Sequence, residues 1–116
     1  MKHEVFAADE LEPGGVRAVE VGGIRIAVAR TPDGEFHALR DRCSHSGAKL
    51  SIGWLQPFLV SAKAGDFEDS GKFTLRCPWH GYEFDLESGV CPADPKRNRV
   101  KVYAVTVEDG KVFIER

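Results

Sequence analysis

Apolar and polar residues alternate along parts of the chain, and this alternation predicts β-strands. Ile24, Ile26 and Val28 are separated by small or charged residues, and a second alternating run extends from Tyr103 to Ile114. A period of two places successive side chains on opposite faces of an extended strand. Strands are expected near 3–8, 16–21, 24–30, 35–40, 72–76, 82–86, 100–107 and 111–115, with one helical turn at Asp9-Glu10-Leu11.

Turn-forming residues separate these runs and indicate tight hairpins. Gly22-Gly23, Pro32-Asp33-Gly34 and Asp109-Gly110 stand between neighbouring strands, where backbone freedom suits short antiparallel connections. Many short strands at this spacing predict an all-β fold of small antiparallel sheets, arranged as a sandwich or barrel. The 116 residues fit a single domain, and no internal repeat or long linker divides them.

Composition and charge exclude several classes of function. Sixteen basic and eighteen acidic residues leave a formal net charge of −2, which gives no overall attraction to nucleic acid or to an anionic membrane. No apolar run approaches the roughly 18 residues of a membrane span, and the first residues lack the apolar stretch of a signal peptide. We therefore expect a soluble, cytoplasmic protein that is monomeric in isolation.

Three cysteines, an odd number, argue against a disulfide framework and make metal ligation the first alternative. Two of them belong to short motifs that also contain histidine, Cys43-Ser44-His45 and Cys77-Pro78-Trp79-His80. Thiolates and imidazoles suit either zinc or an iron–sulfur centre. A zinc finger commonly takes both cysteines from one turn and both histidines from one helix, whereas each motif here provides one of each. Two cysteines on one iron and two histidines on the other would form the Rieske ligand set.

The motifs and their flanks resemble the Rieske 2Fe-2S proteins over nearly the whole chain. Residues 43–51, CSHSGAKLS, and 77–89, CPWHGYEFDLESG, are similar to the two cluster-binding loops of that family. Residues 33–39 and 103–110 are similar to its flanking strands. The resemblance implies a Rieske-like fold in which these two loops form a cluster-binding subdomain at about 41–95.

Four cluster ligands follow from the resemblance. Cys43 and Cys77 would bind one iron as thiolates, and His45 and His80 would bind the outer iron of the 2Fe-2S cluster through Nδ1. The alternative for the same residues is a structural zinc site, which would make the chain a binding module without redox activity. In either case the bound metal should stabilise the fold, because its site is absent from the unfolded chain.

Two departures from the cytochrome bc branch of the family bear on the cluster. That branch has a further cysteine in each loop, and the two form a disulfide, whereas Ala48 and Trp79 occupy those positions here. It also has a serine and a tyrosine whose hydroxyls donate to sulfur, whereas this chain has Tyr82 and Phe84. We therefore expect no such disulfide, and a potential toward the low end of the Rieske range of about −150 to +300 mV.

The sequence does not indicate an enzyme acting alone, since it shows no nucleophile with its base, no Gly-rich phosphate loop and no open metal position. The resemblance implies a soluble one-electron carrier, similar to the Rieske ferredoxins of bacterial oxygenases. Its donor would be a flavin-dependent reductase, and its acceptor a ring-hydroxylating oxygenase. The alternatives are a small subunit of another oxidoreductase, such as an assimilatory nitrite reductase, and an iron–sulfur sensor.

The segment between the two motifs is longer than the resemblance implies. Thirty-one residues separate His45 from Cys77, and the alternation of apolar residues is lost from Ser51 to Lys72. We expect an insertion at about 54–71 that projects as a hairpin or flap beside the cluster and shapes partner docking. The alternative is a tolerated surface insertion, because lengthening a loop costs little closure entropy.

Residues near the motifs carry further expectations. Gly47 and Gly81 would let the backbone approach the cluster closely, and residues 91–95 would form a third, proline-bearing loop over it. Cys91 is expected to pack as a small apolar residue rather than to act as a fifth thiol near the cluster. The basic run 96–99, with Lys101, is either a docking site for an acidic partner or a solvated loop.

Overall fold

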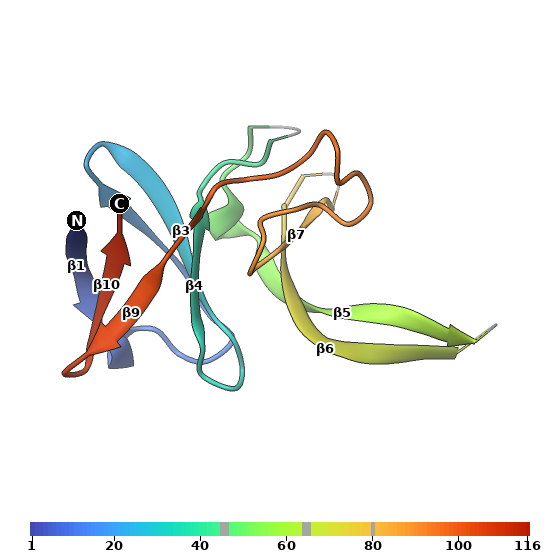
Figure 1. The fold of residues 1–116 in the computed structure, drawn as a ribbon, viewed down its shortest axis with the longest axis horizontal. Coiled ribbons are helices and arrows are strands. Elements are labelled where there is room, and N and C mark those ends of the chain that lie inside the picture. Colours follow the sequence, from blue (N-terminus) through green and yellow to red (C-terminus); the bar gives the residue numbers. More distant parts are fainter. Residues whose placement is uncertain (45–46, 64–65, 80) are drawn as a thin grey trace.

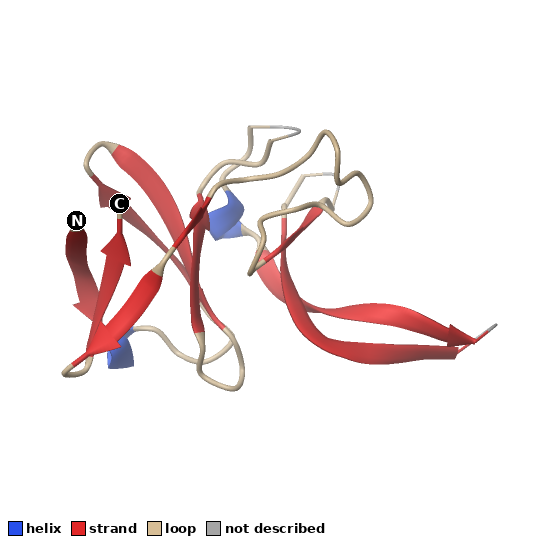
Figure 2. Ribbon diagram, viewed as in Figure 1, coloured by secondary structure: helices blue, strands red, loops and turns tan. Residues whose placement is uncertain are grey.

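The computed structural model describes residues 1–44, 47–63, 66–79 and 81–116, and for 58–63 and 66–71 it describes the backbone alone. The strands in these residues form three antiparallel sheets (Figures 1 and 2). The first sheet has the order β1 (Lys2–Ala7), β10 (Lys111–Glu115), β9 (Val105–Glu108). The second has the order β2 (Val16–Val21), β3 (Ile24–Arg30), β4 (Phe36–Arg40), β8 (Val102–Tyr103). The third has the order β5 (Trp54–Lys63), β6 (Asp66–Arg76), β7 (Glu83–Asp85).

Two short 3-10 helices complete the described elements, η1 (Ala8–Glu10) and η2 (Leu50–Ile52). The first overlaps the helical turn expected at 9–11, and the second was not expected. In the described part of the chain, no helix has the length and apolar character needed to cross a bilayer. The expected all-β fold of small antiparallel sheets is confirmed.

The predicted hairpins form because their turn residues adopt the left-handed backbone conformation. Gly22 and Gly23, between β2 and β3, have φ angles of 57° and 82°. Asp109 and Gly110, between β9 and β10, have φ angles of 51° and 73°. Positive φ at both central residues matches the backbone twist to that of the flanking strands. These turns therefore set the register of the two hairpins.

The expected strand at 100–107 is divided between two sheets. β8 pairs with β4 in the second sheet, whereas β9 pairs with β10 in the first. The division falls at Ala104, whose carbonyl accepts a hydrogen bond of 2.9 Å from the Glu115 amide. The chain passes from the second sheet to the first at this residue. The apolar alternation continues through this point, so it does not show the change of sheet.

Strand β3 separates two buried clusters. Ile26 and Val28 belong to a cluster between the first two sheets, and Ala27 and Ala29 belong to a second cluster with the cysteines. Successive side chains of a strand point to opposite faces, so each cluster takes alternate residues of β3. The small alanine side chains allow the segments around the cysteines to pack closely on this face.

The segment between the motifs forms the long hairpin β5–β6. Its base is the pair Trp54 and Arg76, directly before Cys77, and it extends away from the other two sheets (Figure 1). The pairing has irregularities after Pro57 and after Ser61. A hairpin or flap was expected at about 54–71, but β5 and the first part of β6 were not among the expected strands, because these irregularities interrupt the period of two.

Candidate metal centre

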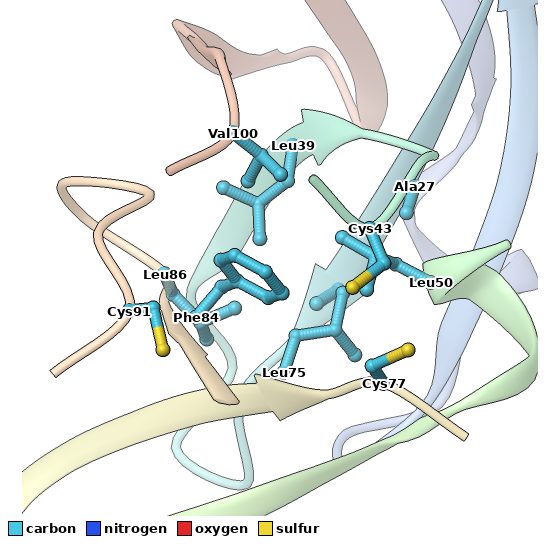
Figure 3. Close-up of a cluster of buried hydrophobic side chains, with 11 residues drawn as sticks. Ala27, Leu39, Cys43, Leu50, Leu75, Cys77, Phe84, Leu86, Cys91 and Val100 are labelled. Atoms are coloured by element: carbon cyan, nitrogen blue, oxygen red, sulfur yellow. The ribbon is translucent and has the colours of Figure 1, made fainter. Parts of the chain in front are cut away.

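Cys43 and Cys77 come from separate loops and lie in the same buried cluster. Cys43 follows β4, and Cys77 directly follows β6. Their exposed fractions are 1% and 0%, and neither forms a disulfide. Both contact the apolar cluster that includes Leu75 and Phe84, and Figure 3 shows them on the same side of Phe84. The fold therefore brings the two predicted thiolate ligands into one region.

His45 and His80, the other two predicted ligands, lie outside the described residues. Within the described ranges, no group of three or more His, Cys, Asp or Glu side chains could hold a metal ion. The assignment of these two histidines to the cluster therefore stays a prediction.

The first loop turns tightly around Cys43. The Cys43 amide donates a hydrogen bond of 2.8 Å to the Ala48 carbonyl, and the Gly47 amide donates one of 2.8 Å to the Cys43 carbonyl. Gly47 has a φ of 76°, which a residue with a Cβ adopts only with strain. The two hydrogen bonds fix the direction of the backbone on both sides of residues 45–46.

The second loop directs a backbone amide at a cysteine sulfur. The Cys77 amide donates a hydrogen bond of 2.7 Å to the Tyr82 carbonyl, which closes the loop. The Trp79 amide lies 3.4 Å from Cys77 Sγ and donates to it. An N–H donor stabilises negative charge on sulfur, so this contact favours the thiolate form that binds metal.

A buried carboxylate anchors the first loop at both ends. Asp41, 5% exposed, precedes the loop, and its side chain accepts hydrogen bonds from Ser51, which follows it. The Ser51 amide and hydroxyl lie 2.6 and 2.7 Å from the carboxylate oxygens. The Arg25 Nε of β3 donates a further bond of 2.6 Å. This anchor was not expected from the sequence, because three residues distant in sequence form it and none belongs to a metal-ligand motif.

Arg76, at the base of the hairpin, lies close to Gly81 of the second loop. Its Nη1 donates a hydrogen bond of 3.0 Å to Gln56 Oε1, and its guanidinium lies 5.7 Å from the centre of the Trp54 ring. A Cβ placed on Gly81 would lie 2.6 Å from Arg76 Nη2 and 3.0 Å from Nε. The guanidinium therefore occupies the space that any larger residue at position 81 would need.

Gly81→Ala is expected to destabilise the second loop by about 2 kcal/mol, from left-handed backbone strain and displacement of Arg76. Gly110→Ala is the matched control. Gly110 has a φ of 73° against 70° for Gly81, and a Cβ there would meet no atom within 4 Å. Chemical unfolding of both variants separates the two causes. An equal loss of stability would contradict crowding by Arg76.

Asn98, which follows the third loop, connects that loop to the first loop. The Ser44 hydroxyl donates a hydrogen bond of 3.1 Å to Asn98 Oδ1, and Asn98 Nδ2 donates one of 3.1 Å to Asp94 Oδ2. Cys91 is 1% exposed, and Figure 3 shows it across Phe84 from Cys43 and Cys77. Cys91 packs as an apolar residue in the core, as expected.

The residues present fit a metal group that is held by thiolates. Two reduced cysteines are shielded from water, and each follows a strand that fixes its position. Buried thiols in an apolar setting are ordinarily inert, but a hydrogen bond to sulfur and two glycine-containing turns are features of sites that bind metal. The described donors suit an iron–sulfur centre or zinc equally well.

Comparisons with known proteins distinguish these alternatives. The Rieske [2Fe-2S] domain family matches residues 1–104. The 3-phenylpropionate/cinnamic acid dioxygenase ferredoxin subunit of Photorhabdus laumondii is 37% identical over 110 residues, 95% of this chain and 90% of the relative.

Two solved structures share the fold. One, assigned as an NADH-dependent nitrite reductase small subunit from Mycobacterium tuberculosis, has a TM-score of 0.84 and 28% identity, covering 100% of this chain and 95% of that chain. The other is a chain in the complex of reduced oxygenase and oxidized ferredoxin of carbazole 1,9a-dioxygenase. It has a TM-score of 0.73 and 31% identity, covering 97% of this chain and 91% of that chain.

The fold and the two buried thiols fit a small β protein that binds a metal group through cysteine. The chain belongs to the Rieske [2Fe-2S] domain family. Its cofactor is a Rieske-type 2Fe-2S cluster, and the predicted family and cofactor are confirmed. The zinc alternative is therefore set aside.

Proposed function

We propose that the chain is a soluble one-electron carrier, with Cys43, His45, Cys77 and His80 as the cluster ligands. The observation that supports this most directly is the convergence of two buried, reduced thiols from separate loops on one core. When bound, the cluster supplies one-electron oxidation and reduction. The chain's own residues keep water from the cysteine sulfurs, direct the Trp79 amide at Cys77 and hold the first loop through Asp41.

We propose a flavin-dependent reductase as electron donor and an oxygenase as acceptor. The relative from Photorhabdus laumondii is named as a ferredoxin subunit of a dioxygenase, and the carbazole dioxygenase structure contains an oxygenase with a ferredoxin. A small subunit of a nitrite reductase is the second candidate, because one structure with that assignment has a TM-score of 0.84. The presence of all four ligand-type residues in the two motifs favours the carrier.

Exposed apolar residues near the two loops support docking of a protein partner. Ile52, Trp54 and Trp79 have exposed fractions of 65%, 49% and 61%. Aromatic residues are enriched at protein interfaces, and exposed ones beside a functional site mark contact surfaces. We also propose that the hairpin at 54–71 takes part in docking, since the exposed residue Trp54 forms the base of this hairpin.

We further propose one domain at 1–116, with the cluster-binding subdomain at about 41–95 and the insertion at about 54–71. The proposal of a single domain is supported by one buried cluster of side chains, to which β3, β4 and the cysteine loops all contribute. A cytoplasmic location is supported by three cysteines that form no disulfide.

Electron paramagnetic resonance tests the carrier function. The purified protein should give no cluster signal when oxidised and a rhombic signal of low average g after anaerobic reduction. Iron and sulfide analysis should give about two of each per chain. A colourless protein that is silent after reduction and holds about one zinc per chain would contradict the proposal.

The midpoint potential should lie below zero on the hydrogen scale. Phe84 is fully buried and has no hydroxyl to donate to a cluster sulfur, so one stabilising contact to the reduced state is missing. Redox titration monitored by circular dichroism measures the potential. Phe84→Tyr should raise it, and Phe73→Tyr, on the same cluster of side chains, serves as a control. A midpoint clearly above zero in the wild-type protein would refute this expectation.

A further inference from the structure

Four basic residues line one open depression beside the first loop. Arg40, Arg42, Arg99 and Lys101 surround it, together with Ser44 and Val100. All four basic side chains are exposed, and no acidic residue is among the described residues that line the depression. We call these four residues the basic face. Ser44 directly follows Cys43, so the basic face borders one of the two loops of the site.

The backbone holds the basic face together from two segments of the chain, 40–44 and 98–101. The Arg40 amide donates a hydrogen bond of 2.9 Å to the Lys101 carbonyl, and the Arg42 amide donates one of 2.8 Å to the Arg40 carbonyl. Ser44 and Asn98 connect the first loop to the segment that precedes Arg99. The four cations are therefore grouped by the fold and do not share a freely moving loop.

The basic face lacks the ion pairs found elsewhere in the described structure. Basic side chains such as Lys2, Arg17 and Lys111 pair with glutamates at 3.0 to 3.5 Å. Among the described residues, no carboxylate pairs with any of the four cations of the basic face. Like charges held side by side repel each other, so this grouping costs stability unless an external anion offsets it.

We propose that the basic face is the docking surface for an acidic patch on a redox partner protein. This inference rests on the proposed carrier function, because it places the partner beside the Cys43 loop. The chain has eighteen acidic residues and a net charge of −2, so a long polyanion such as nucleic acid would meet repulsion beyond the four cations. A compact acidic patch on a folded partner matches the small size of the basic face.

The direction in which added salt changes the rate of reaction with anions distinguishes this proposal from an effect of net charge. A chain of charge −2 repels anions overall, and added salt would then speed its reactions with anions. A local basic face attracts anions at short range, and added salt would slow the same reactions. The two explanations therefore predict opposite trends for one measurement.

Binding of fluorescein-labelled octaglutamate to the intact, cluster-loaded protein tests the surface directly. Fluorescence anisotropy at low salt should show binding that Arg99→Glu with Lys101→Glu weakens about tenfold or more. Lys2→Glu with Lys111→Glu is the matched control, since it changes the charge equally at two residues that do not line the depression and should weaken binding less than about threefold. Circular dichroism confirms that both variants are folded.

Stopped-flow oxidation of the dithionite-reduced protein provides a second readout. Each ferricyanide ion takes one electron from one reduced protein and becomes ferrocyanide. The wild-type rate should fall with added salt. Arg99→Glu with Lys101→Glu should slow the reaction about fivefold and reverse the salt effect, because the basic face is then neutral and the chain carries more negative charge. With hexaammineruthenium(III), a cationic oxidant, the oxidation rate of the wild-type protein should rise with added salt.

Three results would overturn the docking proposal. These are equal octaglutamate binding by the two double variants, a ferricyanide rate that rises with salt in the wild type, and tighter binding of a labelled oligothymidylate of equal charge. The last result would identify nucleic acid as the occupant. Failure of dithionite to reduce the protein would instead remove the carrier function, while the anisotropy measurement would still decide the surface.

Discussion

Cys77→Ala should yield a protein without the cluster, with iron and sulfide near zero and no signal after reduction. Cys77 is fully buried, and no other described thiol lies close enough in the loops to replace it, since Cys91 is across Phe84. Formation of a metal site on folding adds directly to the free energy of unfolding. We therefore expect a much lower yield of folded protein as well, measured by gel filtration and circular dichroism.

Cys91→Ala is the matched control for the loss of a buried cysteine. Cys91 is 1% exposed, so this variant removes a similar volume from the same cluster of side chains. It should lower the free energy of unfolding by only about 1 kcal/mol and retain about two irons per chain. If Cys91→Ala also lost the cluster, Cys91 would have a role beyond packing. If Cys77→Ala kept the cluster, the proposed ligand set would be wrong.

The fold could be predicted where local sequence determines local structure. The glycines of the β2–β3 turn and the Asp109-Gly110 turn require φ angles that few other residues adopt, so each marks its hairpin. The burial of Ala27 and Ala29 could not be read in this way. Their face of β3 is covered by residues from the cysteine loops, which lie far away in sequence. Alternation shows which residues share a face, but it does not show what covers that face.

The same distinction between local motifs and tertiary contacts separates the site residues that were predicted from those that were missed. The two motifs are short and local, and their residue types predicted both thiols, which the fold brings together. Asp41 and Arg76 were missed because their roles depend on tertiary contacts with Arg25, Ser51 and Gly81. A single carboxylate or guanidinium next to a motif resembles an ordinary surface charge until its partners are known. We expect Asp41 to help the first loop hold its shape through its hydrogen bonds to Ser51.

Replacement of the buried Asp41 carboxylate is expected to lower the free energy of unfolding strongly. Asp41→Ala removes the acceptor for three hydrogen bonds, two from Ser51 and one from Arg25. A buried donor left without a partner costs about 1–3 kcal/mol, and Asp41→Ala leaves two Ser51 donors without this acceptor. Because the Arg25 side chain is 49% exposed, water can solvate it after the change. We expect the free energy of unfolding to fall by about 3 kcal/mol.

A comparison of Asp41→Ala with its partners shows whether the carboxylate anchors the loop or only pairs with Arg25. Arg25→Gln and Ser51→Ala should each lower the free energy of unfolding by about 1 kcal/mol, measured by urea unfolding. Because Asp41 and Ser51 flank the first loop, Asp41→Ala and Ser51→Ala should also speed release of iron to a chelator, whereas Arg25→Gln should change that rate little. Equal rates of iron release in all three variants would show that the hydrogen bonds to Ser51 do not hold the cluster loop in place.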